Sequence, residues 1–405
     1  MSQDPLAALE EVVRTERRRV LATLVRTLGD LQLAEDAVQE ATVAALRTWP
    51  ARGVPADPRA WLTVTARHRA LDVLRRESRR DGKEAAVEWT GAQEPERDQD
   101  VPDDLLRLLF TCCHPALSVE SQVALALRTL IGLSVEEIAE VLLVEPSAMA
   151  KRLVRVRQKI ARAGIPYRVP PAADLPARLT AVLAVVHLVY TAGHGPRTGP
   201  SPVRVDLCEQ GVRLARLVVE LMPAEAEATA LLALLLLTDA RRPARTDDSG
   251  AVVLLPEQDR RRWDQHLLRE GADVLADAGR LRTGPPGDYL LQARLAACHS
   301  LVASYALTDW RTVVGLYDQL LVRRPSPVLR LNRAVALGER DGAQAMLAEL
   351  DGTPLQRSHL WHAARAEALH RLGQRQAAAD ALDQALALVP GEADRRLLEL
   401  RRQSR

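Results

Sequence analysis

The sequence has few aromatic residues, few lysines and no long hydrophobic run. Phe, Trp and Tyr together make up 3% of its 405 residues, and the alternating runs that are typical of β-strands are absent. Ala, Leu and Arg dominate instead, and all three are good helix formers. The composition therefore predicts an all-α protein.

Cysteine and apolar segments are also scarce. The longest apolar run, residues 228–237, is interrupted by Thr229 and is much shorter than the ~20 residues that a membrane-spanning helix needs. The amino end lacks the apolar core of a secretory leader. We therefore expect a cytoplasmic protein with free thiols and no membrane partner.

A metal site is not expected from the cysteines. Cys112, Cys113 and His114 are consecutive, whereas zinc ligands come in pairs separated by a few residues. Small buried cysteines are the simpler interpretation. No other group of His, Cys, Asp and Glu has a catalytic or metal-binding spacing, so we expect neither a cofactor nor an enzyme.

The net charge is only +2, so any affinity for nucleic acid must come from local basic patches. One such patch is the segment from residue 145 to residue 162. Met149, Leu153, Val156 and Ile160 recur there at helical spacing and would form a buried face. A different face carries basic side chains that stay in water: Lys151, Arg155, Lys159 and Arg162.

A short helix is predicted directly before this basic helix. Ser134 and Glu137 have the spacing of a capping box at its start, and Pro146 suits the first turn of the basic helix. A short capped helix, a tight connection and a longer basic helix form a helix-turn-helix, whose second helix enters the DNA major groove. The alternative is a solvated basic helix on an ordinary helical protein.

The amino-terminal part carries two further surfaces. Asp36, Gln39 and Glu40 cluster within little more than one turn of a predicted helix, which indicates either a protein-docking face or an ordinary solvated face. The next helix has seven arginines against two acidic residues between residues 59 and 80. It is a second basic patch, and its main basic positions are Arg67, Arg69, Arg75, Arg76, Arg79 and Arg80.

The composition changes twice more along the chain. Residues 81–104 are rich in Asp and Glu and are interrupted by Pro and Gly, which predicts an acidic linker extended by self-repulsion. After residue 175 one helical pattern follows another. Gly373, Ala378, Leu382, Ala385 and Pro390 have the spacing of half a tetratricopeptide unit, so we predict a stack of helices up to residue 405.

These features occur in an order that resembles an extracytoplasmic-function (ECF) sigma factor of bacterial RNA polymerase. The resemblance covers about residues 5–165, through AEDAVQE, PRAWLTVTARHRALDVLRRE, the acidic linker and the helix-turn-helix. The rest resembles the tetratricopeptide-like extension of one subgroup. The implied domains are region 2 (1–80), the linker (81–104), region 4 (105–165) and the helical extension (175–405).

The resemblance also implies partners and residue roles. It implies that Asp36, Gln39 and Glu40 dock on the β′ clamp of core RNA polymerase, and that the polymerase contacts include the β flap. The extension is expected to act by contact, either by holding the two DNA-binding parts in place or by binding an anti-sigma or other regulatory protein. Non-template DNA of the minus-ten element would contact Arg67, His68, Arg69, Arg75 and Arg76. Duplex DNA of the minus-thirty-five element would contact Ser147, Lys151, Arg152 and Arg155.

Two other classes of protein share part of this pattern. A helix-turn-helix transcription activator with a helical sensor domain needs neither a polymerase-docking face nor a second basic patch. A helical scaffold that binds only proteins needs no DNA affinity, whereas phosphate contacts give a steep dependence on salt. The sequence favours the sigma factor, because both basic patches and the acidic segment between them then have a purpose.

Overall fold

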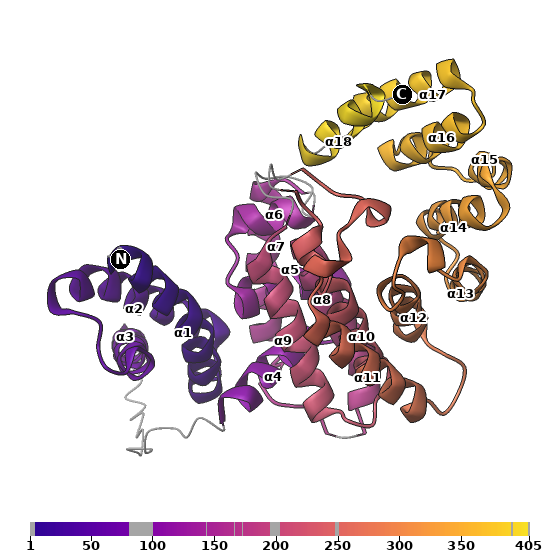
Figure 1. Ribbon diagram of the computed structural model, residues 1–405. Coiled ribbons are helices and arrows are strands. Elements are labelled where there is room, and N and C mark those ends of the chain that lie inside the picture. Colours follow the sequence, from indigo (N-terminus) through magenta and orange to yellow (C-terminus); the bar gives the residue numbers. More distant parts are fainter. Residues whose placement is uncertain are drawn as a thin grey trace. The chain divides into compact units, whose positions relative to one another are not determined.

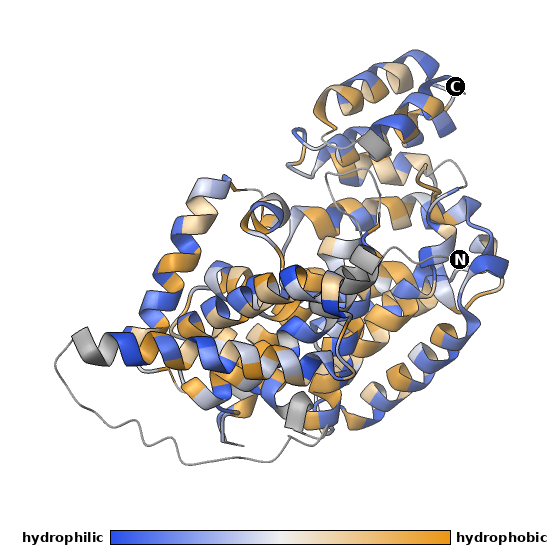
Figure 2. Cartoon of the chain, turned by 90° about the vertical axis from the view of Figure 1, so that its left-hand side faces the viewer, coloured by the Kyte–Doolittle hydropathy of each residue, from blue (hydrophilic) through white to orange (hydrophobic). Residues whose placement is uncertain are grey.

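A computed structural model describes residues 5–80, 100–142, 144–165, 167–171, 173–194, 203–247, 251–389 and 392–403 of the chain. All the elements of regular secondary structure in these ranges are helices (Figure 1). The described residues also contain one isolated β-bridge, between Thr246 and Val252. The all-α prediction is therefore confirmed. Hydrophobic and hydrophilic residues alternate along most helices, as expected for amphipathic elements (Figure 2).

The chain divides into two compact units, residues 1–185 and residues 186–405. The boundary falls inside a helix rather than at the Pro-rich segment before residue 175. The elements of the first unit, with the helix that crosses the boundary, are α1 (Pro5–Leu28), α2 (Leu31–Arg52), α3 (Pro58–Arg80), α4 (Asp100–Cys112), α5 (Val119–Ala126), η1 (Leu127–Ile131), α6 (Val135–Leu142), α7 (Pro146–Arg162) and α8 (Leu175–His194).

Helices α1, α2 and α3 pack on one another as a three-helix bundle. Gly29, with a φ of 69°, ends α1, and the Asp30 carboxylate caps α2 by accepting from the Leu33 amide at 3.0 Å. Part of the inward face of α2 is made of small residues, because Ala37 and Ala41 are buried beside larger residues such as Trp49, while Leu33 is only half-buried. Small side chains let the helix axes approach closely.

The predicted acidic linker is shorter than expected at its carboxyl end. Helix α4 begins at Asp100, and residues 81–99 lie outside the described residues. Asp104 is 1% exposed and forms ion pairs with Arg26 at 3.1 Å and with Arg107 at 3.5 Å. Acidic residues favour the first turn of a helix, where they meet its positive end, so the amphipathic pattern that starts at Leu105 extends back into the acidic segment.

Buried charges join the bundle α1–α3 to the helices α4–α7. Glu35 of α2 is 6% exposed, and its Oε2 atom lies 2.5 Å from Nη2 of Arg157 on α7. The Thr129 hydroxyl of η1 donates to Glu35 Oε1 at 3.4 Å. The pair between Asp104 and Arg26 joins α4 to α1 in the same way. The first unit is therefore closed by ionic contacts between segments far apart in sequence.

Two further side chains complete this contact. The Tyr167 hydroxyl donates to the carbonyl oxygens of Asp104 at 2.9 Å and Ala22 at 3.3 Å. Arg17 of α1 lies against η1, since a Cβ atom on Gly132 would stand 3.2 Å from its Nη1 atom. Burial lowers the pKa of Arg17, Arg128 lowers it further and Glu35 opposes both.

The second unit is built around a buried helix, α10 (Ala226–Asp239). This helix is enclosed by α9 (Val205–Leu221), α11 (Gln265–Leu281) and α12 (Asp288–Ser300). Nearly all its residues are buried, which explains why its sequence is apolar on every side. Three short 3-10 turns lie near its carboxyl end or between α10 and α11: η2 (Arg242–Ala244), η3 (Leu255–Glu257) and η4 (Arg260–Arg262).

The remaining helices pack mainly on their neighbours in sequence (Figure 1). They are α13 (Trp310–Arg323), α14 (Pro327–Asp341), α15 (Ala343–Asp351), α16 (His359–Arg371), α17 (Arg375–Leu388) and α18 (Glu392–Gln403), with η5 (Tyr305–Leu307) before α13. Ala378, Leu382 and Ala385 are buried as predicted, and Gly373 has a φ of 75° between α16 and α17. Pro390 lies outside the described residues.

We predict that Leu235→Ala in α10 destabilises the second unit by ~2–5 kcal/mol, because the truncation leaves a cavity in a fully packed environment. Leu235 is 0% exposed. The measurement is the urea concentration at the unfolding midpoint. Leu360→Ala is the matched control, since Leu360 is 54% exposed and its removal should change stability by less than ~0.5 kcal/mol. Equal midpoints for the two variants would contradict the central position of α10.

Candidate nucleic-acid and polymerase interface

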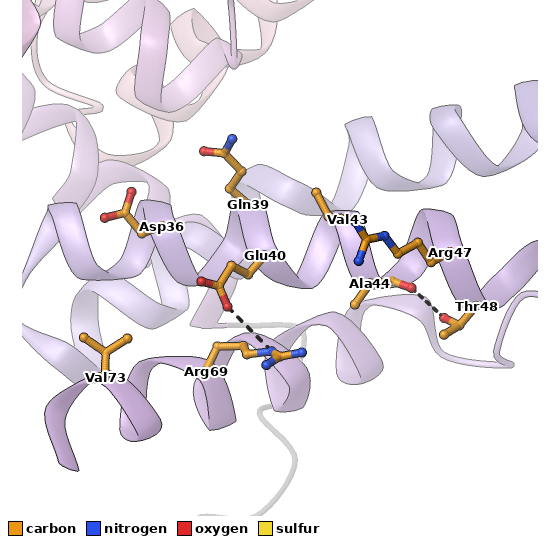
Figure 3. A pocket seen from close by; sticks show the side chains of 9 residues that line it. All are labelled: Asp36, Gln39, Glu40, Val43, Ala44, Arg47, Thr48, Arg69 and Val73. Carbon is orange, nitrogen blue, oxygen red and sulfur yellow. Dashed lines mark hydrogen bonds and ion pairs between the residues drawn. The ribbon is translucent and has the colours of Figure 1, made fainter. Parts of the chain in front are cut away.

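The predicted docking residues form one exposed stripe on α2. Asp36, Gln39 and Glu40 all point away from the bundle core and line a surface hollow between α2 and α3 (Figure 3). The amide of Gln32 donates to the Asp36 carboxylate at 2.9 Å. Exposed Val43, one turn further along, adds an apolar contact area. A carboxylate, an amide and an apolar side chain on one face suit a protein partner with basic side chains.

One predicted DNA-binding residue faces this stripe. Nε of Arg69 on α3 lies 3.6 Å from Oε2 of Glu40, and both side chains are about half exposed. The sequence assigned these residues to different surfaces, whereas the fold brings them to the rim of the same hollow (Figure 3). An exposed ion pair of this kind contributes little to stability, so either residue can exchange its partner at low energetic cost.

The other basic residues of α3 lie along its solvent side. His68, Arg75 and Arg76 are exposed, while Arg67 is half-buried and burial lowers its pKa. Arg75 lies 3.8 Å from Asp72. Four of the five predicted residues thus stand on accessible surface, which is what phosphate contacts and stacking with single-stranded bases require.

Aromatic packing fixes the start of α3. The Trp61 ring meets the buried Trp49 of α2 edge to face, with centroids 5.3 Å apart. Trp61 is half-buried. The contact places α3 against α2 and so fixes the direction of its basic face.

The helix-turn-helix has the predicted caps. The Ser134 amide donates to Glu137 Oε2 at 2.8 Å, and the Glu137 amide donates to Ser134 Oγ at 3.1 Å. This reciprocal capping box starts α6. Pro146 occupies the first turn of α7, and three residues separate the two helices. The buried residues of α7 are those predicted: Met149, Leu153, Val156 and Ile160.

The amino-terminal half of α7 presents its polar side chains to solvent. Ser147, Lys151 and Arg155 are exposed and Arg152 is half-buried. Lys151 and Arg155 also line a shallow surface hollow with the exposed Val154. Basic groups on the first turns of such a helix are placed to reach base edges and phosphates in the major groove.

Two basic residues of α7 serve the protein itself. Arg157 is turned inward to Glu35, as described above, and the Lys159 ammonium donates to the carbonyl oxygen of Ala116. Sequence reasoning did not assign Glu35 a role. Its signal was its position, because Glu35 follows Ala34 on the inward side of α2, where a carboxylate needs a buried partner.

The cysteines lie in the core. Cys112 and Cys113 are buried free thiols, and burial raises the pKa of Cys113 to about 12. The described residues contain no group of three His, Cys, Asp or Glu side chains that could hold a metal ion. In the described part of the chain, no helix is long and apolar enough to cross a membrane.

Comparison with known proteins agrees with this architecture. Residues 12–80 match the family model of sigma-70 region 2, and residues 107–160 match that of sigma-70 region 4. The chain belongs to the sigma-70 family. It is an ECF sigma factor with a carboxyl-terminal extension, and it directs RNA polymerase to promoters. Residues 178–279 of the extension match a family of unknown function (DUF6596).

Relatives cover the sigma factor to different extents. An uncharacterized protein of Rhizobium meliloti is 41% identical over 382 residues, which are 92% of this chain and 90% of that protein. A probable ECF RNA polymerase sigma factor, SigI of Mycobacterium tuberculosis, is 30% identical over 180 residues, 42% of this chain and 60% of that protein. No solved structure matches the chain.

We predict that Arg155→Ala weakens binding to a duplex carrying the minus-thirty-five element by ~1–3 kcal/mol, because a base or phosphate contact is lost. Fluorescence anisotropy of labelled duplex at several salt concentrations measures this. Arg162→Ala is the matched control, since Arg162 is equally exposed but stands at the other end of α7. If Arg162→Ala cost as much as Arg155→Ala, reading by the first turns of α7 would be ruled out.

Proposed function

We propose that three surfaces of this sigma factor divide the recognition of polymerase and promoter. Asp36, Gln39 and Glu40 dock on the β′ clamp. The basic side of α3, with Arg67, His68, Arg69, Arg75 and Arg76, holds the melted non-template strand of the minus-ten element. Ser147, Lys151, Arg152 and Arg155 on α7 read the minus-thirty-five duplex, while region 4 meets the β flap. The observation that carries this proposal is the exposed basic start of α7 above its buried apolar stripe.

The two DNA surfaces differ in the way their tasks require. A duplex is read by a helix that enters the major groove, which suits the isolated exposed end of α7. A single strand needs cationic and planar groups along a surface, which suits the long arginine-bearing side of α3. The polymerase supplies the chemistry, so we infer that the sigma factor is not itself an enzyme and acts in the cytoplasm.

The closed first unit is too small to occupy both promoter elements at once. The elements are about 25 base pairs apart, or ~85 Å of duplex, whereas a compact body of ~165 residues is only about 40 Å across. The nineteen residues 81–99 can reach ~65 Å when extended. We therefore infer that regions 2 and 4 must separate when the sigma factor engages a promoter, and that the Glu35–Arg157 pair must break.

The helical extension has the properties of a regulatory domain. It carries more than half of the residues, and its helices stack in the manner of domains that present extended surfaces to proteins. We propose that a regulatory protein, such as an anti-sigma factor, binds it and biases the equilibrium between closed and open forms of the first unit.

The first experiment is run-off transcription on genomic fragments with core polymerase and this chain as its sole sigma factor. We expect Asp36→Lys to lower affinity for core polymerase about tenfold, equivalent to ~1.4 kcal/mol, because it reverses a charge in the docking stripe. Glu120→Lys, at an exposed carboxylate on α5, is the control and should bind normally. Absence of any run-off product with the unaltered chain would refute the function, and normal binding of Asp36→Lys would refute the docking face.

The second experiment follows the closed form. We expect Glu35→Gln to separate regions 2 and 4, because it leaves the Arg157 guanidinium buried without its counter-charge, a change that costs ~3–5 kcal/mol in buried pairs. Spin labels at Val64→Cys and Val154→Cys report the distance, since both sites are exposed. Cys298→Ala removes the one half-exposed native thiol.

Glu120→Gln again serves as the control for this experiment. It removes an exposed carboxylate from the same unit and should leave the label distance unchanged. Label distances in Glu35→Gln identical to those in the unaltered protein would show that the ion pair does not hold the unit closed.

A further inference from the structure

Arginine side chains gather at the carboxyl end of α10. Arg241, Arg242 and Arg245 lie in and beside η2, and Arg260 belongs to η4. The two turns contact each other, and the Asp264 amide donates to the Ala240 carbonyl at 2.8 Å. The chain thereby brings four guanidinium groups to one place, and all four are half-buried.

Among the contacts of the described residues, one carboxylate, that of Asp239, pairs directly with this arginine cluster. Asp239 is 4% exposed, pairs with Nε of Arg242 at 3.2 Å and accepts from the Tyr190 hydroxyl at 3.4 Å. Arg245 is hydrogen-bonded to Nε2 of His194 rather than to an acid. The cluster therefore holds more positive charge than its direct contacts neutralise.

Arg260 is held by neutral groups. Its Nη1 atom donates to the carbonyl oxygens of His299 at 3.0 Å and Val302 at 2.7 Å, and its guanidinium lies over the Trp263 ring, 4.3 Å from the centroid. These contacts fix the direction of the guanidinium without cancelling its charge. A positioned cation of this kind is suited to bind an anion.

Several buried nitrogen atoms in the cluster have no hydrogen-bond partner among the described residues. They are Arg241 Nε, Arg260 Nη2, Trp263 Nε1 and His299 Nδ1. Leaving one such group unsatisfied costs ~1–3 kcal/mol, and native proteins normally supply a partner. Three of the four can only donate, so the missing partner is an acceptor.

Three further carboxylates of the described residues near the cluster are engaged elsewhere or act at longer range. The Asp264 carboxylate caps α11 by accepting from the amides of His266 and Leu267. Asp394 and Glu209 act only at longer range, on Arg245 and Asp239 respectively.

The lowered pKa values of two neighbouring histidines agree with this excess of positive charge. Burial, followed by the neighbouring arginines, lowers the pKa of His194 to about 2 and that of His299 to about 4. Both rings are therefore neutral at pH 7, and neither adds to the charge that an acceptor would meet.

We propose that Arg241, Arg260, Trp263 and His299 form a binding site for a small phosphate-bearing ligand. A phosphate group offers several acceptor oxygens and about two negative charges, which match several donors and an excess of guanidinium groups better than a single carboxylate does. The extension is then a receptor for a phosphorylated small molecule. This inference does not depend on polymerase or promoter binding, so each can fail without the other.

The test uses the full chain, with inorganic phosphate and pyrophosphate as probes. Thermal unfolding and calorimetry are followed against phosphate concentration, with sodium chloride at equal ionic strength as the blank. A ligand that binds the native state raises the unfolding temperature with its concentration. Arg241→Met and Arg260→Met should each weaken phosphate binding at least about tenfold, while Arg261→Met should not, because Arg261 is 90% exposed and paired with Asp259.

A second variant keeps the test decisive if an arginine variant fails to fold. Trp263→Phe retains a buried aromatic ring, removes the indole N–H together with the five-membered ring, and should still weaken phosphate binding several-fold. The proposal is overturned if phosphate stabilises no more than chloride, or if the cluster variants bind as well as Arg261→Met. Displacement of phosphate by promoter duplex would assign the cluster to the DNA backbone and would also overturn it.

Discussion

The arrangement of the first unit depends on buried ion pairs, foremost the one between Glu35 and Arg157. Neither residue is needed to build its own helix, because α2 and α7 have complete apolar faces without them. Their pairing joins regions of the chain that are 122 positions apart in sequence. A buried ion pair adds little net stability compared with apolar packing. Removing only one of its two partners is costly, because the other charge then stays buried without a counter-charge. It therefore specifies which surfaces meet more than it strengthens them.

The same reasoning explains why the contact can serve a reversible function. An apolar interface of similar size would expose hydrophobic surface to solvent when it opens, whereas the two charged side chains become hydrated again when they separate. Part of the free energy needed to separate such a pair is therefore offset by the hydration that both charged groups regain. The basic helix α7 has two sides with different tasks: one holds the closed unit and the other faces solvent.

Much of the fold followed from the sequence because its signals are local. The capping box at Ser134, the stripe from Met149 to Ile160 and the repeat of small residues around Leu382 each predict an element that the structure contains. Long-range pairings were not predictable. Nothing local marks Glu35 as the partner of Arg157, or Glu40 as a neighbour of Arg69, because these contacts arise only after helices pack. The start of α4 was missed for a related reason, since an acidic segment is typical both of a linker and of a first helical turn.

The stacked helices from α13 to α18 have a different physical character from the closed first unit. Each helix contacts chiefly those before and after it, so the free energy of the stack is a sum of neighbouring terms rather than one indivisible core. Such an array can deform elastically, because each interface between neighbouring helices can shift a little. Strain introduced at one end is therefore expected to spread as many small rotations between neighbouring helices instead of one large break. A partner that grips the stack can therefore change its curvature gradually, without unfolding any helix.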